Sequence, residues 1–370
     1  MEFLLPEELV SFEASLRQFF TKNVGSAVLR SSSFEDTTEE LKLNQDLWQQ
    51  VADLGVFAAC VSEGHGGLGM GIVSAELILG LSGEFLIPVP VFETLGLGAA
   101  ILANTGDTEY SSDLLSKIAA GELRVTAALE QLACSIPDAV VSTNGAESRI
   151  TGKFDLCPSA DFADVILVPA LNAKKELRLY AIERSADGIK TQRTPTFDCI
   201  RPFYQLDLNN CPASALCEEP LSSSALAGMR DVMSLCAAAE MTGAARRCVS
   251  MSVDYAQTRT QFGKPIGSFQ AIAHKLADMH VLVESSQALV RFAAWACDND
   301  QSQSPSACSA AKAYASKVCP KVAQEAIQAH GGIGFTYEYD LHFFLRRTRT
   351  LSALFGTEHQ HSAKLAELSA

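Results

Sequence analysis

No stretch of this sequence approaches the ~20 consecutive apolar residues that a membrane-spanning helix needs. Several signature motifs are missing as well: no G-x-G-x-x-G follows a strand pattern, and the sequence has neither a P-loop nor a G-x-S-x-G. These absences count against a membrane span, a Rossmann dinucleotide site, a P-loop nucleotide site and a G-x-S-x-G hydrolase.

Basic residues are scarce. Lys and Arg total 29 against 43 Asp and Glu, which gives a net charge of −14 over 370 residues. Nucleic acids and anionic membranes attract basic surfaces, so neither is expected as the main partner. A local basic pocket for a phosphorylated cofactor stays compatible with this balance.

The cysteines form no metal-ligand pattern. The 11 cysteines include no C-x-x-C and do not cluster with histidine, so we expect no structural metal. In a reducing compartment they are interpreted as small buried residues. Residues 1–8 are acidic and interrupted by Pro6, unlike a secretory or transit peptide, which favours the cytoplasm. A mean hydropathy of +0.12 without a span suggests an oligomer with buried interfaces.

Composition divides the chain into three zones. Residues 1–122 carry helical apolar spacing, residues 123–222 carry short alternating or β-branched runs, and residues 223–370 return to long Ala-rich helices. Helices are expected at 225–258, 270–298, 305–330 and 341–355, with a flexible loop at 298–309. Such long helices usually form a bundle. The predicted fold is mainly α, with an N-terminal helical domain, a central antiparallel β domain and a C-terminal four-helix bundle.

Two segments carry candidate chemistry. Residues 259–270 join two long helices, and an Arg at a helix end beside a glycine turn can bind a phosphate with its guanidinium fork. Residues 328–336 follow a helix, and three glycines there let a backbone approach an anion. Taken singly, each also fits a plain interpretation: a turn with a solvated Arg, and a helix C-cap followed by a loop.

Taken together and in this order, the segments resemble the acyl-CoA dehydrogenase family over nearly the whole chain. Residues 61–71 resemble its V-P-E-x-x-G-G-L-G segment, and residues 259–270 its R-x-x-F-G-x-x-I-x-x-x-Q turn. Residues 328–336 resemble its Q-x-x-G-G-x-G-x-T loop, and residues 356–357 the end of its E-G-T segment.

The resemblance implies an activity and a cofactor. Family members use FAD to oxidise the Cα–Cβ bond of an acyl-CoA thioester: a carboxylate removes the α-proton and the β-hydride goes to flavin N5. Electron-transfer flavoprotein is the implied electron acceptor, and tetramers are common. The implied cofactor-binding residues are Arg259 at the pyrophosphate; Gln261, Phe262 and Gln270 at the flavin or adenine; Gln328, Gly331 and Gly332 toward a neighbouring subunit's FAD; and Thr357 at a pyrophosphate or flavin edge.

Both usual positions of the family's catalytic base lack a carboxylate here. The Glu of the family's Y-E-G-T segment is replaced by Phe355. The position used by a minority of members, 26 residues before Arg259, is Met233. Asp231 is close in sequence but lies roughly 200° away around a helix.

Glu240 is the candidate base that remains. It follows Met233 by seven residues, about two helical turns, so it shares a helix face with Met233. Its small apolar neighbours favour a raised carboxyl pKa. The alternatives are a Glu that caps a neighbouring loop or pairs with Arg246 or Arg247, and a base supplied by a partner chain.

The β domain also departs from the family pattern. The T-E-P-x-x-G-S-D entry corresponds to residues 126–134, without the glycine, Ser and Asp, and the aromatic flavin strand corresponds to residues 156–158. An eroded flavin face beside an intact bundle resembles one subunit of the α2β2 steroid side-chain acyl-CoA dehydrogenases, in which two chains share each FAD site. A self-sufficient homotetramer using Glu240 and a non-catalytic scaffold subunit remain the alternatives.

Overall fold

The computed structural model describes residues 5–34, 41–105, 108–129, 138–144 and 147–369. Its first part is helical, as the spacing of apolar residues predicted. The elements are α1 (Glu7–Asn23), α2 (Ser26–Ser32), α3 (Gln45–Asp53), a short 3-10 turn (Glu63–His65), α4 (Gly71–Phe85), a π-helical stretch (Phe92–Ala99), α5 (Ala100–Thr105) and α6 (Glu109–Ala119). The π-helical stretch has wider turns than an α-helix and leads directly into α5.

The middle of the chain forms one seven-stranded sheet. Its strands are β1 (Val125–Ala127), β2 (Val140–Asn144), β3 (Glu147–Pro158), β4 (Val165–Leu171), β5 (Leu177–Glu183), β6 (Ile189–Thr194) and β7 (Phe203–Ala215). β4 pairs with both β2 and β5, while β7 joins β3 to β5, so the sheet closes into a barrel around its own apolar core. The expectation of purely antiparallel strands is wrong in one respect, because β4 runs parallel to β1 and β2.

The last part is a helical bundle. Its elements are α7 (Ser223–Thr258), α8 (Gln270–Asn299), α9 (Ser304–His330), α10 (Leu341–Ala353) and α11 (Glu358–Leu368). Between α7 and α8 the chain makes a two-stranded turn, β8 (Thr260–Gln261) and β9 (Lys264–Pro265). The flexible loop expected at 298–309 is much shorter, because α8 and α9 extend to within a few residues of each other.

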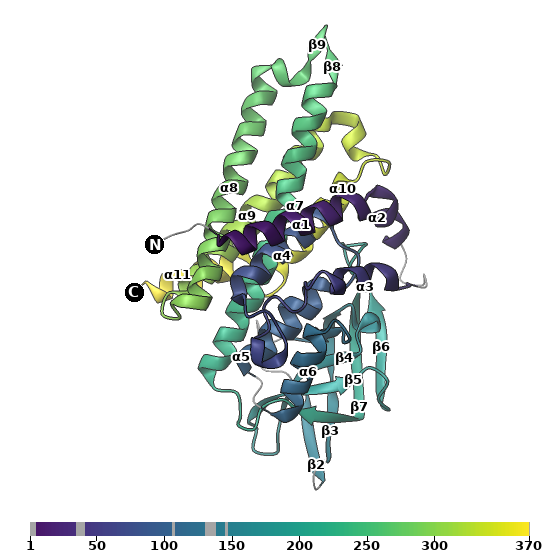
Figure 1. Ribbon diagram of the computed structural model, residues 1–370, viewed down its shortest axis with the longest axis vertical. Coiled ribbons are helices and arrows are strands. Elements are labelled where there is room, and N and C mark those ends of the chain that lie inside the picture. Colours follow the sequence, from purple (N-terminus) through teal and green to yellow (C-terminus); the bar gives the residue numbers. More distant parts are fainter. Residues whose placement is uncertain (1–4, 35–40, 106–107, 130–137, 145–146, 370) are drawn as a thin grey trace.

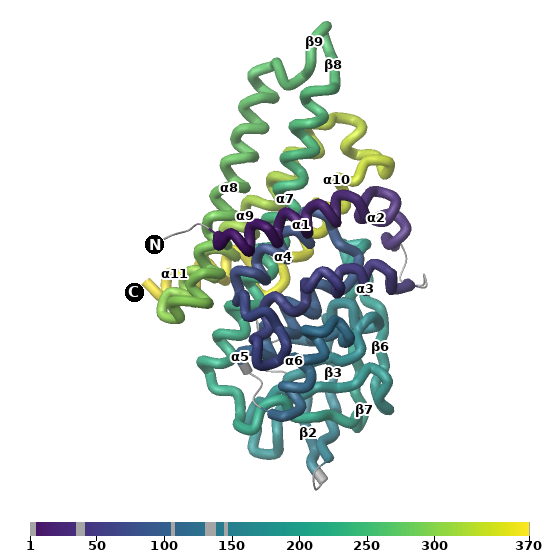
Figure 2. The backbone as a smooth tube through the Cα atoms, viewed as in Figure 1, coloured from purple at the N-terminus to yellow at the C-terminus, as the bar shows by residue number. Residues whose placement is uncertain are grey.

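Helices α7 and α8 rise side by side beyond the rest of the molecule, with β8 and β9 at the tip, while the β barrel lies at the opposite end (Figure 1). α11 lies well below that tip and packs against α9 (Figure 2). The arrangement confirms the predicted fold class. Among the described residues no helix has both the length and the apolar character to cross a bilayer.

Backbone contact fixes how α4 crosses α7. A Cβ built on Gly243 would lie 1.7 Å from the Gly80 carbonyl oxygen, and one on Gly83 would lie 1.9 Å from the Glu240 carbonyl oxygen. No side chain larger than hydrogen fits these contacts, so the two helices approach closely at these glycines. This contact brings α4 against the segment of α7 that carries Glu240.

Candidate functional site

An outer pocket of about 500 Å³ lies near the tip of the α7–α8 hairpin. It brings together residues of the two motif segments, which are some 70 positions apart in the sequence. Arg259 and Gln261 come from the turn after α7, whereas Gln328, Gly331 and Gly332 come from the end of α9 and the loop behind it. Five of the eight predicted cofactor residues therefore line one surface.

The outer pocket suits an anion. No carboxylate of the described residues pairs with the exposed Arg259 guanidinium, which leaves its fork of N–H donors available. Gly331 has φ +63°, and neither Gly331 nor Gly332 has any atom within 4 Å of where a Cβ would stand. The backbone is thus bare toward open space, as an approaching pyrophosphate requires.

The other three predicted cofactor residues lie elsewhere. Phe262 is 92% exposed at the tip, with φ +51°, and Gln270 is the exposed first residue of α8. Thr357 caps α11: its hydroxyl accepts a hydrogen bond from the Gln360 backbone N–H at 3.4 Å. Within one chain Thr357 lies apart from the outer pocket, because α11 is far below the tip (Figure 2). None of these three placements tests contact with a cofactor.

A second, inner pocket of about 210 Å³ collects the positions where the family resemblance implies a base. Met233 and Phe355 both line it, and neither side chain can accept a proton. The remaining lining residues are Ala227, Arg230, Asp231, Gly356, Gln360, His361 and Lys364. Phe355 is buried and stacks with Phe92 at a centroid distance of 6.4 Å, so an aromatic contact stands where the resemblance implies a carboxylate.

Asp231 also lines the inner pocket, although it lies roughly 200° from Met233 around the helix. Every residue of α7 from Asp231 to Ala245 is buried, so neighbouring elements surround this segment on all sides. The Asp231 carboxylate pairs with Lys364. Burial raises the pKa of Asp231, and Lys364 opposes that rise.

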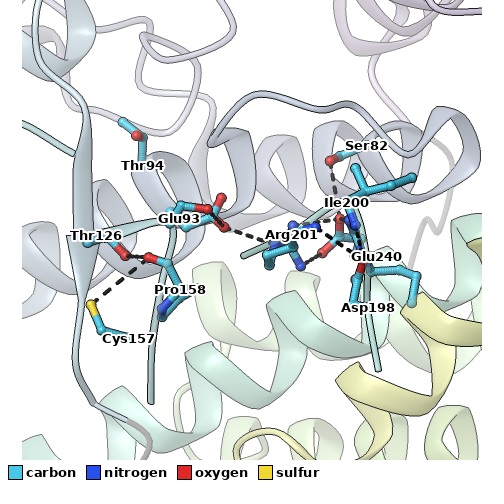
Figure 3. A network of polar contacts seen from close by, with 12 residues as sticks. Ser82, Glu93, Thr94, Thr126, Cys157, Pro158, Asp198, Ile200, Arg201 and Glu240 are labelled. Carbon is cyan, nitrogen blue, oxygen red and sulfur yellow. Dashed lines mark hydrogen bonds and ion pairs between the residues drawn. The ribbon is translucent and has the colours of Figure 1, made fainter. Parts of the chain in front are cut away.

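Glu240 lies outside the inner pocket, in a buried network of charges (Figure 3). Arg201 donates to both of its oxygens, each at 2.9 Å, and Arg347 donates to Oε1 at 2.7 Å. Ser82 adds a hydrogen bond at 3.3 Å, and Glu240 is 0% exposed. The alternative of a paired Glu240 therefore fits, but with Arg201 and Arg347 rather than with Arg246 or Arg247.

Two further carboxylates complete this network. Arg201 Nε contacts Glu93 Oε1 at 2.9 Å, and Arg347 pairs with Asp198. Glu93 comes from the π-helical stretch, Asp198 and Arg201 from the segment between β6 and β7, Glu240 from α7 and Arg347 from α10. All five side chains are buried, so the network joins the three parts of the chain at their common centre.

The network favours the charged form of Asp198. Burial, the largest single influence, would raise the pKa of Asp198, but Arg347, Arg201 and the Ile200 backbone N–H together lower that pKa below its ordinary 3.8. Arg201 also lies over the Phe92 ring, 4.5 Å from its centre. Both oxygens of Glu240 accept arginine N–H bonds and the side chain is 0% exposed, so neither oxygen is open to a substrate. This geometry counts against a role for Glu240 as the catalytic base. That role remains an untested prediction.

The β-domain positions that depart from the family pattern are partly described. The Thr126 hydroxyl donates to the Pro158 carbonyl at 2.6 Å, and Pro158 pairs with Phe203 at the end of β3. Ser159 has φ +52° and donates to Glu93 at 2.8 Å. The Thr126 and Ser159 hydroxyls thus form hydrogen bonds with other groups of this chain. Residues 130–134 lie outside the described residues.

Comparison with known proteins identifies the family. Residues 6–122 match the model of the acyl-CoA dehydrogenase N-terminal domain, and residues 226–368 match that of the acyl-CoA dehydrogenase C-terminal domain. Together these matches cover most of the chain. The chain therefore belongs to the acyl-CoA dehydrogenase family, as the motif order predicted.

Relatives of full length share this architecture. Acyl-CoA dehydrogenase IpdE2 of Mycobacterium tuberculosis is 28% identical over 96% of this chain and 95% of its own. A variant of the Tcur3481–Tcur3483 steroid ACAD has a TM-score of 0.86 at 28% identity, with 98% of each chain covered. The ChsE4–ChsE5 complex of Mycobacterium tuberculosis matches with a TM-score of 0.86 at 22% identity, over 99% of this chain and 98% of that one.

Proposed function

We propose that this chain is one subunit of an FAD-dependent acyl-CoA dehydrogenase that introduces a Cα–Cβ double bond into an acyl-CoA thioester and shares its FAD site with a different family subunit. One observation carries the proposal: the outer pocket keeps five predicted cofactor residues on one surface, whereas the inner pocket has Met233 and Phe355 at both usual base positions. This chain thus has the residues expected to bind the cofactor but lacks a carboxylate at both usual base positions.

The chain's part in cofactor binding lies in the outer pocket. Arg259 would hold the FAD pyrophosphate by its guanidinium, and Gly331 and Gly332 would offer backbone N–H groups to the same anion. Gln261 and Gln328 would donate amide hydrogen bonds beside them. FAD, when bound, supplies the oxidising chemistry by accepting a hydride from the substrate β-carbon. The protein contributes position and polarisation.

In this proposal the partner subunit supplies the carboxylate that removes the α-proton. Glu240 has both oxygens engaged by arginines in a buried site, and a general base needs a free lone pair directed at the substrate. Asp231 lines the inner pocket but is paired with Lys364. The alternatives are a self-sufficient homotetramer that uses Glu240 as its base, and a non-catalytic scaffold subunit, which would bind no flavin in any complex.

The proposed substrate is the CoA thioester of a steroid side chain or of another bulky acyl group. The support is similarity at full length to IpdE2 and to the Tcur3481–Tcur3483 steroid ACAD. The two-chain Tcur3481–Tcur3483 and ChsE4–ChsE5 assemblies support an α2β2 heterotetramer. Electron-transfer flavoprotein is the proposed electron acceptor, by family membership.

The deciding experiment compares turnover of the two-chain complex with and without substitutions in this chain. Acyl-CoA-dependent reduction of an artificial electron acceptor is measured for the wild type, Glu240→Gln and Asp231→Asn, at a temperature where all are folded. If the partner supplies the base, both variants keep turnover within about tenfold of the wild type. Loss of a general base costs about 10²–10⁴-fold. A loss of that size in one variant would assign proton abstraction to this chain and overturn the assignment of the base to the partner subunit.

A further inference from the structure

Two cysteines face each other where α8 ends and α9 begins. The Cys297 and Cys308 sulfurs lie 3.6 Å apart, and the Ser304 hydroxyl contacts both, at 3.1 Å and 3.8 Å. A disulfide bond needs about 2.05 Å between the sulfurs, so little movement separates this pair from bonding distance. Neither residue belongs to the outer or inner pocket.

The two thiols differ in exposure and acidity. Cys297 is half-buried and Cys308 fully buried. The hydrogen bond from the Cys308 thiol lowers the pKa of Cys297 below its ordinary value, although burial opposes this, and the pKa of Cys308 is raised well above it. Cys297 is therefore the thiol that ionises first, and the thiolate is the reactive form.

Five of the other described cysteines lack this combination. Cys157, Cys236, Cys248 and Cys319 are fully buried, and burial raises the pKa of each thiol. Cys60 is half-buried, but burial raises its pKa to about 12. These thiols serve as internal references, because a general oxidation of the protein would have no reason to select the Cys297–Cys308 pair.

The backbone around the pair is held in place. The Asp298 carboxylate accepts hydrogen bonds from the Ile72 and Val73 backbone N–H groups, at 2.8 Å and 3.0 Å, and so ties the end of α8 to the start of α4. The Asp300 carboxylate accepts from the Ser302 backbone N–H and from the Gln303 side chain, at 3.2 Å and 2.6 Å. The loop between the cysteines is thus braced at both ends, which keeps the two sulfurs in contact.

We propose that Cys297 and Cys308 form an oxidation site that reacts with hydroperoxides and closes to a disulfide. The Cys297 thiolate attacks a peroxide oxygen, the O–O bond breaks, and an alcohol or water leaves with the proton while Cys297 becomes a sulfenic acid. The Cys308 sulfur then attacks the Cys297 sulfur, the S–S bond forms, and water leaves. Overall, two thiols are oxidised and one hydroperoxide is reduced. The site acts without FAD and is independent of the function proposed above.

The sequence makes a direct test possible. Trypsin cuts after Arg291 and Lys312 and at no site between them, so residues 292–312 form one peptide whose only cysteines are Cys297 and Cys308. The purified full-length chain is reduced, desalted, treated with one equivalent of hydrogen peroxide, blocked with an alkylating reagent and digested. We expect this peptide to lose two hydrogen atoms and to escape alkylation, at a rate about tenfold or more above the loss of any other thiol.

Variants separate the two steps. Cys308→Ser removes the resolving thiol, so we expect Cys297 to stop at a sulfenic acid that a dimedone probe captures. Cys248→Ser removes a buried reference thiol and is expected to close the disulfide as the wild type does. Retention of both thiols in the wild-type peptide while other cysteines oxidise would overturn the proposal. Conversion of Cys297 to a sulfinic acid without loss of the Cys308 thiol would overturn it equally, and both results need only the wild-type protein.

Discussion

Replacing Glu240 by Gln tests whether this carboxylate holds the centre of the fold together. The substitution keeps the shape of the side chain and removes its charge. The amide oxygen can occupy the Oε1 position, where it still accepts from Arg201 at 2.9 Å and Arg347 at 2.7 Å. The amide N–H₂ group then occupies the Oε2 position, where it faces the Arg201 Nη1 donor at 2.9 Å. One hydrogen bond between opposite charges becomes a contact between two donors, and the two others now join a charged arginine to a neutral oxygen, without the attraction of opposite charges.

The size of this effect follows from burial. Hydrogen bonds to charged groups contribute about 1.5–3 kcal/mol each, and removing one partner of a buried ion pair costs about 3–5 kcal/mol. Glu240 is 0% exposed and Arg201 is 5% exposed, so solvent cannot take over the lost contacts. An entropy of unfolding near 2.1 cal/mol/K per residue over 370 residues converts this cost into a melting temperature lower by about 4–6 °C.

The assay is thermal unfolding of the wild type and of Glu240→Gln, followed by circular dichroism at pH 7. Glu325→Gln is the matched control: its carboxylate pairs with Lys275 at 2.5 Å, but both side chains are about one third exposed. Such an ion pair contributes at most ~1 kcal/mol, so its melting temperature should change by about 1 °C. Equal, small shifts in both variants would refute the reasoning that the buried network carries structural energy.

Three further predictions concern the helix crossing, the inner pocket and the outer pocket. Gly243→Ala places a methyl group against the Gly80 carbonyl and should destabilise the fold by about 3 kcal/mol in denaturant unfolding. Its control, Gly228→Ala on the same helix, meets open space and should stabilise the fold by about 0.5–1 kcal/mol. Similar effects of both substitutions would contradict the close approach of α4 and α7. Burial lowers the pKa of His361 from 6.5 to about 4, so the unfolded chain takes up a proton at a higher pH than the folded chain does. The free energy of unfolding should therefore fall by about 3 kcal/mol as the pH drops from 6.5 to 4, and His361→Gln should reduce that fall. The same pH profile in the wild type and the variant would show that His361 is not the cause. Arg259→Ala should lower the flavin content of the purified two-chain complex without changing its melting temperature by more than about 1 °C, and full flavin retention would remove Arg259 from the cofactor site.

Much of the fold follows from local sequence. Apolar spacing predicts the helices of the first and last zones, since a helix that packs on one side shows its period directly. The order of the motifs identifies the family. The parallel pairing of β4 with β1 and β2 was missed, because short β-branched runs carry no information on strand direction.

The site was only partly predictable, for reasons of distance and burial. Glu240 was singled out as the candidate base, and that role stays a prediction. Its partners Arg201 and Arg347 lie 39 and 107 positions away, and spacing along one helix cannot reveal them. Met233 and Glu240 share a face of an ideal helix, yet two turns separate them along its axis by about 10 Å, and only Met233 reaches the inner pocket. Asp231 was set aside because it lies roughly 200° from Met233 around the helix, yet both residues line the inner pocket.

The most direct test of the central claim is the flavin content and mass of the purified chain, alone and co-expressed with a second acyl-CoA dehydrogenase subunit from the same organism. We expect little flavin in the chain alone, and one FAD for each pair of chains in a mixed tetramer. One FAD for every chain in a homotetramer would contradict it.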